Sequence, residues 1–150
     1  FAYAGEALSG KYYGAGNKEG LRITVRRLFA FGVIMALMFT AVYVFGGVGF
    51  LCLLTSDTAV VTAAQPYLFW AYLIPIAGMA AFVLDGVFIG LTATKGMLFS
   101  TAMAMITFFV VYYLFWNSYG NNALWIAFLS FLGMRGLASI LWARRYLVII

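Results

Sequence analysis

The sequence predicts an all-α, polytopic transmembrane helix bundle, and three observations lead to this fold class. Of the 150 residues, 66% are hydrophobic and only 9% are charged, whereas about a quarter of the residues are charged in an average soluble domain. The apolar residues form runs long enough to cross a bilayer, which takes about 20 residues. The basic residues gather at alternate ends of these runs. A soluble globular fold is excluded, because polar side chains are too few to cover a water-facing surface.

Charges and turn residues divide the chain into four full spans and one partial span. We expect a partial helix over 1–13 and full spans over 28–54, 63–91, 97–116 and 123–143. Gly14 and Gly16 are expected to end the partial helix, and Asn17 to cap the segment after it. The run Asn-Ser-Tyr-Gly-Asn-Asn over 117–122 is typical of a turn and separates the last two spans. Residues 14–27 are expected to form a loop.

The distribution of basic residues predicts how the spans are oriented. The basic side chains near span ends are Lys11, Lys18, Arg22, Arg26, Arg27, Lys95, Arg144 and Arg145. The connections at the other ends carry only Asp57. Cytoplasmic loops of membrane proteins carry an excess of Lys and Arg. We therefore expect a multi-pass protein of the plasma (inner) membrane, with residues 14–27, Lys95 and the C-terminus in the cytoplasm.

Two charged residues lie deep inside the predicted spans. Asp85 comes ten residues before Lys95, and Arg135 comes nine residues before Arg144, which places each about 13–15 Å from the inner boundary at 1.5 Å per residue. A charge at that depth must face protein, water, a cation or a proton. Asp85 is therefore a candidate for ion or proton coupling, and Arg135 is its candidate charge partner. The alternative is that Arg135 permanently neutralises Asp85 and the pair is structural.

Other residues in the spans are secondary candidates. Glu6 is five residues before Lys11, about 7–8 Å inside the same boundary, where reaching toward headgroups or pairing with an arginine is favoured over a role in transport. Pro75 removes a backbone hydrogen bond in mid-span and predicts a bend that is either a hinge or static. Gly86 and Gly90 form a Gly-x-x-x-Gly pair that allows close helix packing.

Several kinds of chemistry are disfavoured by residues that the sequence lacks. There is no histidine and only one cysteine, which excludes histidine-based metal sites and hydrolases and any intrachain disulfide. Only one aspartate lies at depth, whereas an intramembrane aspartyl protease needs two carboxylates. We expect no enzyme activity, no metal, no nucleic acid partner, and no cofactor apart from a coupling ion.

Three segments together resemble one family of membrane proteins. The first is Gly-Glu-Ala-Leu-Ser-Gly-Lys-Tyr-Tyr-Gly-Ala-Gly-Asn over 5–17, and the second is Phe-Val-Leu-Asp-Gly-Val-Phe-Ile-Gly over 82–90. The third is Asn-Ala-Leu-Trp-Ile-Ala over 122–127, followed by Phe131 and by Met-Arg-Gly over 134–136. In order and spacing, they resemble the multidrug and toxic compound extrusion (MATE) family, in particular its DinF-like branch.

This resemblance implies that residues 1–150 are the C-terminal transmembrane lobe of a twelve-helix transporter. The spans would be the end of helix eight and helices nine to twelve, packed against an N-terminal lobe of the same protein in the lipid bilayer. Members of the family export drugs and other amphipathic or cationic small molecules by antiport with Na⁺ or H⁺ through alternating access. Asp85 would be the acid of the tenth helix. The better supported coupling acids of the DinF-like branch lie in the first lobe, so a structural Asp85–Arg135 pair stays open.

Two other functions remain as alternatives. A flippase for lipid-linked saccharides or another amphipathic lipid would need several basic residues in its cavity to bind phosphates, and Arg135 alone lies at depth. A non-transporting membrane subunit would use its charges only to hold helices together.

Overall fold

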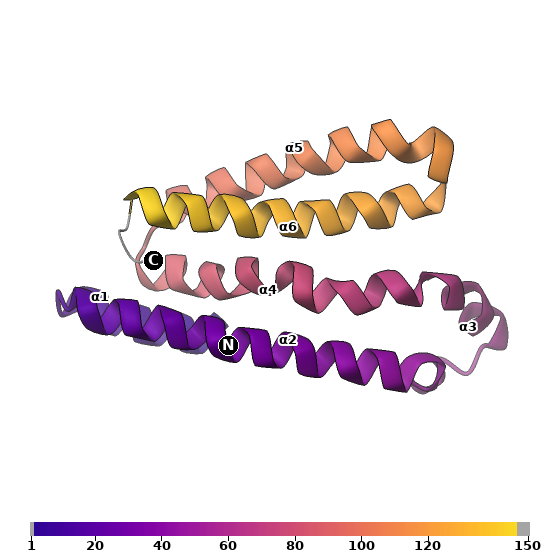
Figure 1. Ribbon diagram of the computed structural model, residues 1–150, viewed down its shortest axis with the longest axis horizontal. Helices are drawn as coiled ribbons and strands as arrows, with labels where there is room; N and C mark the ends of the chain where they lie inside the picture. Colours follow the sequence, from indigo (N-terminus) through magenta and orange to yellow (C-terminus); the bar gives the residue numbers. More distant parts are fainter. Residues whose placement is uncertain (1, 147–150) are drawn as a thin grey trace.

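Long helices lie side by side along most of the chain, with no β-strand among residues 2–146 (Figure 1). The computed structural model describes the backbone of residues 2–146 and the side chains of residues 2–144. In chain order the elements are α1 (Ala2–Gly14), α2 (Lys18–Leu54), α3 (Thr58–Ala64), the short 3₁₀ helix η1 (Gln65–Tyr67), α4 (Leu68–Gly90), α5 (Thr94–Tyr119) and α6 (Asn121–Tyr146). Helix α4 lies at the centre, in contact with α1 and α2 on one side and with α6 on the other, while α5 packs mainly on α6.

Four helical segments of the described chain are long and apolar enough to cross a membrane. They are Lys18–Leu54, Thr58–Gly90, Thr94–Tyr119 and Asn121–Arg144. In hydrocarbon every backbone N–H and C=O group must be satisfied within the protein, and a helix does so within one segment. The predicted all-α, polytopic fold class is therefore confirmed.

The loop expected over 14–27 is wrong for residues 18–27, because α2 already begins at Lys18. The connection is tight: Gly16 adopts a positive φ of 67°, and the side chain of Asn17 accepts a 2.8 Å hydrogen bond from the backbone N–H of Gly20. The basic residues that suggested a loop lie on the exposed face of a helix. Leu21 and Val25 on its other face are buried in the core, and this helical spacing was the signal that the charges masked.

The other helix ends differ from the expected spans by only a few residues along the chain. The second span starts upstream of residue 63, because Asp57 caps α3 by accepting a 2.9 Å hydrogen bond from the backbone N–H of Ala59. Pro66 lies at the start of η1, where its missing N–H is tolerated. The turn expected over 117–122 narrows to Gly120, which has a positive φ of 51° between α5 and α6.

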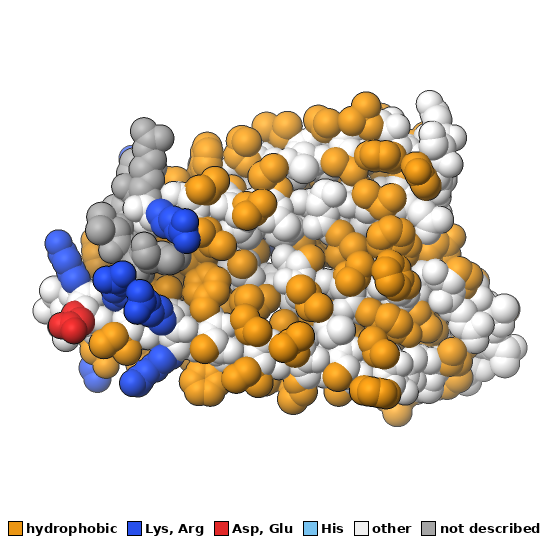
Figure 2. Space-filling view, in the orientation of Figure 1, with side chains coloured by type: hydrophobic (Ala, Val, Ile, Leu, Met, Phe, Trp, Pro, Cys, Tyr) orange, Lys and Arg blue, Asp and Glu red, His pale blue; other side chains and the backbone are white. Residues whose placement is uncertain are grey.

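The described side chains are buried mainly around α4. Leu84 and Phe88 pack with Ala143 of α6, while Val83 and Val87 pack with Leu21, Val25 and Leu28 of α2. Figure 2 shows apolar side chains over most of the visible surface and the Lys and Arg side chains gathered at one end. That is the end where α1 meets α2. The side chain of Arg145, which was expected to add to this cluster, lies outside the described residues.

Helix α1 packs on α4 through glycines. A Cβ built on Gly86 would collide with the backbone carbonyl of Ala2, and one built on Gly90 would collide with that of Glu6. A Cβ on Gly10 would in turn lie 3.2 Å from the carbonyl oxygen of Gly90. The absence of side chains at these positions lets the two backbones approach closely, as small residues do in membrane helix pairs.

Candidate ion-coupling site between two transmembrane helices

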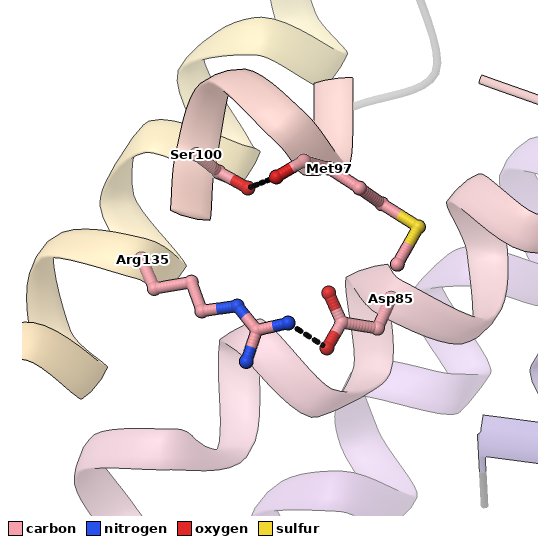
Figure 3. A network of polar contacts seen from close by, with 4 residues as sticks. All are labelled: Asp85, Met97, Ser100 and Arg135. Atoms are coloured by element: carbon pink, nitrogen blue, oxygen red, sulfur yellow. Dashed lines mark hydrogen bonds and ion pairs between the residues drawn. The ribbon is translucent and has the colours of Figure 1, made fainter. Parts of the chain in front are cut away.

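The structure brings Asp85 of α4 and Arg135 of α6 into direct contact. The Nη2 group of Arg135 donates a 2.8 Å hydrogen bond to Oδ2 of Asp85 (Figure 3). The same contact is the ion pair between the two residues. Both side chains are largely enclosed, with 16% of the Asp85 side chain and 19% of the Arg135 side chain exposed. The sequence showed only that such a pair was allowed, whereas the structure shows that the two helix faces meet.

Close packing of α6 on α4 positions the arginine. A Cβ built on Gly136 would lie 3.2 Å from the Cβ of Ala80 and 3.5 Å from the backbone nitrogen of Ala81. Gly136, next to Arg135, therefore lies beside a point on α4 about one turn before Asp85. The long arginine side chain covers this distance of one turn to reach the carboxylate.

The depth expected for Asp85 needs correction. The ten residues between Asp85 and Lys95 were counted as helix, but α4 ends at Gly90 and α5 begins only at Thr94. Asp85 is therefore five residues from the end of its helix, about 7–8 Å along the axis. The chain reverses direction over residues 91–93 and adds little further depth.

The pair leaves polar atoms of both residues without a partner. Among the described residues, Oδ1 of Asp85 and Nε of Arg135 are buried and make no hydrogen bond. Figure 3 shows Met97 and Ser100 of α5 across from the pair, and Ser100 donates a 3.0 Å hydrogen bond from Oγ to the backbone oxygen of Met97. A free carboxylate oxygen enclosed by three helices can accept a proton or contact a cation without the ion pair first having to break.

The secondary candidate Glu6 lies apart from this pair. Its side chain is half-buried on α1, and its backbone carbonyl faces Gly90. Asp85 with Arg135 is the only ion pair in the part of the chain whose side chains are described, so the expected pairing of Glu6 with an arginine is not seen there.

Helix α2 has a kink and helix α4 contains a proline beside a shared cavity of about 520 Å³. Pro75 lies inside α4, and the backbone oxygen of Tyr72, three residues earlier, accepts a 3.1 Å hydrogen bond from Oγ1 of Thr40. Within α2, Gly47 has non-helical angles, with φ at 38° and ψ at −119°. The kink at Gly47 was not expected, although the glycine-rich run over 46–49 was a signal for it. The bend expected at Pro75 stays a prediction.

These features do not form one site. The cavity is lined by residues of α2 and α4, including Gly47 and Pro75, but not by Asp85 or Arg135. Gly86 and Gly90 face α1. In the described part of the chain, no three His, Cys, Asp or Glu residues gather closely enough to hold a metal ion.

Comparison with known proteins agrees with this architecture. The sequence model of the MatE family matches residues 1–114. The chain is 39% identical over 148 residues to DNA damage-inducible protein F of Escherichia coli (strain K12), a match that covers 97% of this chain and 32% of that protein. No solved structure matches the chain. The match over three quarters of its length and the helical, membrane-spanning fold show that the chain belongs to the MatE family of membrane transporters, as a DinF-like member.

Proposed function

We propose that this chain is part of a secondary active transporter that exports drugs or other amphipathic or cationic compounds in exchange for Na⁺ or H⁺. The exchange would proceed by alternating access in the plasma membrane, together with the remaining lobe of the same protein. The single observation that carries the proposal is the enclosed Asp85–Arg135 pair, in which one carboxylate oxygen stays free.

The chemistry of the pair supports a coupling role for Asp85. A charge inside a membrane protein is costly and is kept where it binds an ion, carries a proton or pairs with another charge. If Asp85 takes up a proton, its attraction for Arg135 falls, and the contact between α4 and α6 weakens. A cation at the free oxygen Oδ1 would compete with Arg135 in a similar way. Either event favours one arrangement of the helices over another, which is what coupling requires.

The substrate class is proposed from the amino-acid composition of the chain. Aromatic residues make up 19% of the sequence, and there are seven methionines. Such side chains adapt to apolar and aromatic ligands of varied shape. We assign no substrate-binding residue.

The proposal is tested with the full-length protein in proteoliposomes, with a Na⁺ gradient and a proton gradient imposed separately. We expect one of the gradients to drive export of a cationic dye by the wild type, and Asp85→Asn to abolish that dependence. Asp57→Asn is the matched control, because Asp57 lies at the far end of the bundle and asparagine caps a helix as well as aspartate does. Gradient-driven export that persists unchanged in Asp85→Asn would remove Asp85 from coupling.

A structural role for the pair is the second candidate, and the 2.8 Å ion pair is the observation that favours it. It predicts that exchanging the charges, with Asp85→Arg and Arg135→Asp together, restores folding and leaves transport coupled as in the wild type. A coupling role predicts that the exchanged protein folds but loses its ion dependence. The flippase alternative has less support, because the one deep arginine is already paired with a carboxylate.

A further inference from the structure

Three basic side chains form one stripe on the first part of α2, which we call the basic stripe. Lys18, Arg22 and Arg26 follow one another at intervals of four residues and are exposed, and this spacing keeps them on one face of the helix. None of them has an acidic partner, because Asp85 with Arg135 is the only ion pair in the part of the chain whose side chains are described. The basic stripe is therefore free to bind an anion from outside.

One acidic side chain lies near the basic stripe but does not neutralise it. Glu19 is in the first turn of α2, seven residues before Arg26 and thus about 10 Å from it along the helix axis. Three basic side chains against one acidic side chain leave this face with a net positive charge. The N-terminal end of α2 adds the partial positive charge of the helix dipole.

The depth of the basic stripe matches that of lipid head groups. The uncharged run of α2 begins at Leu28, so Arg26 lies about 3 Å and Arg22 about 9 Å outside it at 1.5 Å per residue. The head-group region on each side of a bilayer is about 5–8 Å thick, which is half the difference between the whole bilayer and its hydrocarbon core. Arg26 therefore lies within the head-group region and Arg22 at its outer edge.

The same face of α2 continues as an exposed apolar surface. Beyond Arg26, the next residues on this face are Ala30, Val33 and Leu37, at spacings of four, three and four residues. All three are exposed, Val33 by 42% and Leu37 by 57%. Figure 2 shows basic side chains at one end of the molecule and apolar side chains directly next to them. This order, basic and then apolar, is that of the head group and acyl chains of an anionic phospholipid.

We propose that the basic stripe binds the phosphate group of an anionic phospholipid in the leaflet at this end of the bundle, with an acyl chain along the apolar residues that follow. The Cβ atoms of residues four apart on a helix are about 5–6 Å apart, so the guanidinium groups of Arg22 and Arg26 can reach one phosphate. Each guanidinium can form two parallel hydrogen bonds to it. The positive-inside rule explains why basic residues lie at this end, but it does not require them to share one face.

The apolar continuation favours a lipid over a soluble anion or an acidic protein. Val33 and Leu37 lie five and nine residues beyond Leu28, about 7–8 Å and 13–14 Å inside the uncharged run. A soluble anion or an acidic protein segment would contact the basic residues but gain nothing from these two side chains. The inference goes beyond the proposed function, because it names a binding partner that does not depend on transport.

Photo-cross-linking of the full-length protein in vesicles tests the assignment. The vesicles contain equal parts of anionic phosphatidylglycerol and zwitterionic phosphatidylethanolamine, and the photoreactive residue p-benzoylphenylalanine replaces the exposed Val33. Mass spectrometry identifies the lipid in each adduct. We expect phosphatidylglycerol to exceed phosphatidylethanolamine among the adducts. Replacing the exposed Leu37 instead gives an independent second reading.

Two pairs of substitutions with equal loss of charge locate the effect. Arg22→Gln with Arg26→Gln is expected to lower the ratio of phosphatidylglycerol to phosphatidylethanolamine adducts about 30-fold, which converts to about 1 kcal/mol for each arginine. Arg27→Gln with Lys95→Gln is the matched control. Arg27 points about 100° away from Arg26 around the helix, and Lys95 lies on α5. All four side chains are exposed, and glutamine is a good helix former, so both pairs are expected to fold.

Four results would overturn the assignment. They are adducts with no preference for phosphatidylglycerol, an equal loss of preference in the two pairs of variants, a cross-link to protein in place of lipid, or loss of the preference when inorganic phosphate is added at constant ionic strength. The second would assign the effect to the overall charge of this end, and the last to a site for soluble anions. The readout involves no transport, so its outcome is separate from that of the proposed function.

Discussion

Arg135 holds Asp85 by a single 2.8 Å contact between Nη2 and Oδ2, and the second oxygen of the carboxylate makes no hydrogen bond among the described residues. A pair of this kind is asymmetric. The contacted oxygen fixes the geometry between α4 and α6, while the free oxygen remains available to a proton or a cation. Structural and coupling roles can therefore reside in the same carboxylate.

The pair predicts a non-additive effect on stability. Asp85→Ala or Arg135→Ala leaves an uncompensated charge in an enclosed site, and each change is expected to cost about 3–5 kcal/mol. The double variant removes both charges and is expected to be more stable than either single variant. Thermal unfolding of the purified full-length protein in detergent measures the three changes. Additive losses in the double variant would show that the two side chains do not interact in the native protein.

The glycine contacts predict opposite results for the same substitution at two places. Gly90→Ala places a Cβ against the backbone carbonyl of Glu6 and 2.9 Å from the backbone nitrogen of Gly10, so α1 must move away, at a cost of about 1–3 kcal/mol. Gly133→Ala is the control, because nothing lies within 4 Å of its Cβ position in α6. Alanine there is expected to raise stability by about 0.5–1 kcal/mol through its higher helix propensity. Unfolding midpoints of the two variants that shift in the same direction would contradict the close approach of α1 to α4.

The contact from Thr40 to the carbonyl of Tyr72 predicts a modest loss. Thr40→Val keeps the shape of the side chain but removes the 3.1 Å hydrogen bond between α2 and α4. Such bonds contribute about 0.6 kcal/mol on average in membrane proteins. Thr107→Val is the matched control, because Thr107 donates only to Met103 on the preceding turn of its own helix. Chemical denaturation is expected to show that the free energy of unfolding of Thr40→Val is lower than that of Thr107→Val by about this amount. Equal free energies of unfolding would argue against the interhelical bond.

The orientation of the bundle is tested with its single cysteine. Cys52 is exposed near the end of α2, remote from the basic cluster. In a full-length protein without other cysteines, we expect a membrane-impermeant maleimide to label Cys52 in intact cells. In a Cys52→Ser background, Lys95→Cys is expected to be labelled only after the cells are permeabilised, because basic ends stay in the cytoplasm. The reverse pattern would invert the proposed orientation.

The sequence predicted the spans well because hydropathy is averaged over about 20 residues. A single residue that departs from the apolar pattern therefore does not change the prediction. It failed where a local signal was ambiguous. The basic residues between Lys18 and Arg27 suit a loop or an exposed helix face equally well. The apolar Leu21 and Val25, which are four residues apart and buried, decide in favour of a helix. The contact between Asp85 and Arg135 could be proposed but not established, because it depends on how α4 and α6 are rotated about their axes. The kink at Gly47 was missed because a glycine-rich run such as 46–49 permits a break in a helix without requiring one.

Asp85 and Gly86 are consecutive residues, so they point about 100° apart around the axis of α4, given 3.6 residues per turn. The first faces Arg135 on α6, and the second faces the backbone of α1. Helix α4 cannot turn away from the arginine without pushing its glycine face along α1, where there is no flexible side chain to absorb the movement. A change in the charge of one carboxylate would thus reach two neighbouring helices at once, through the rigid backbone that connects two adjacent residues.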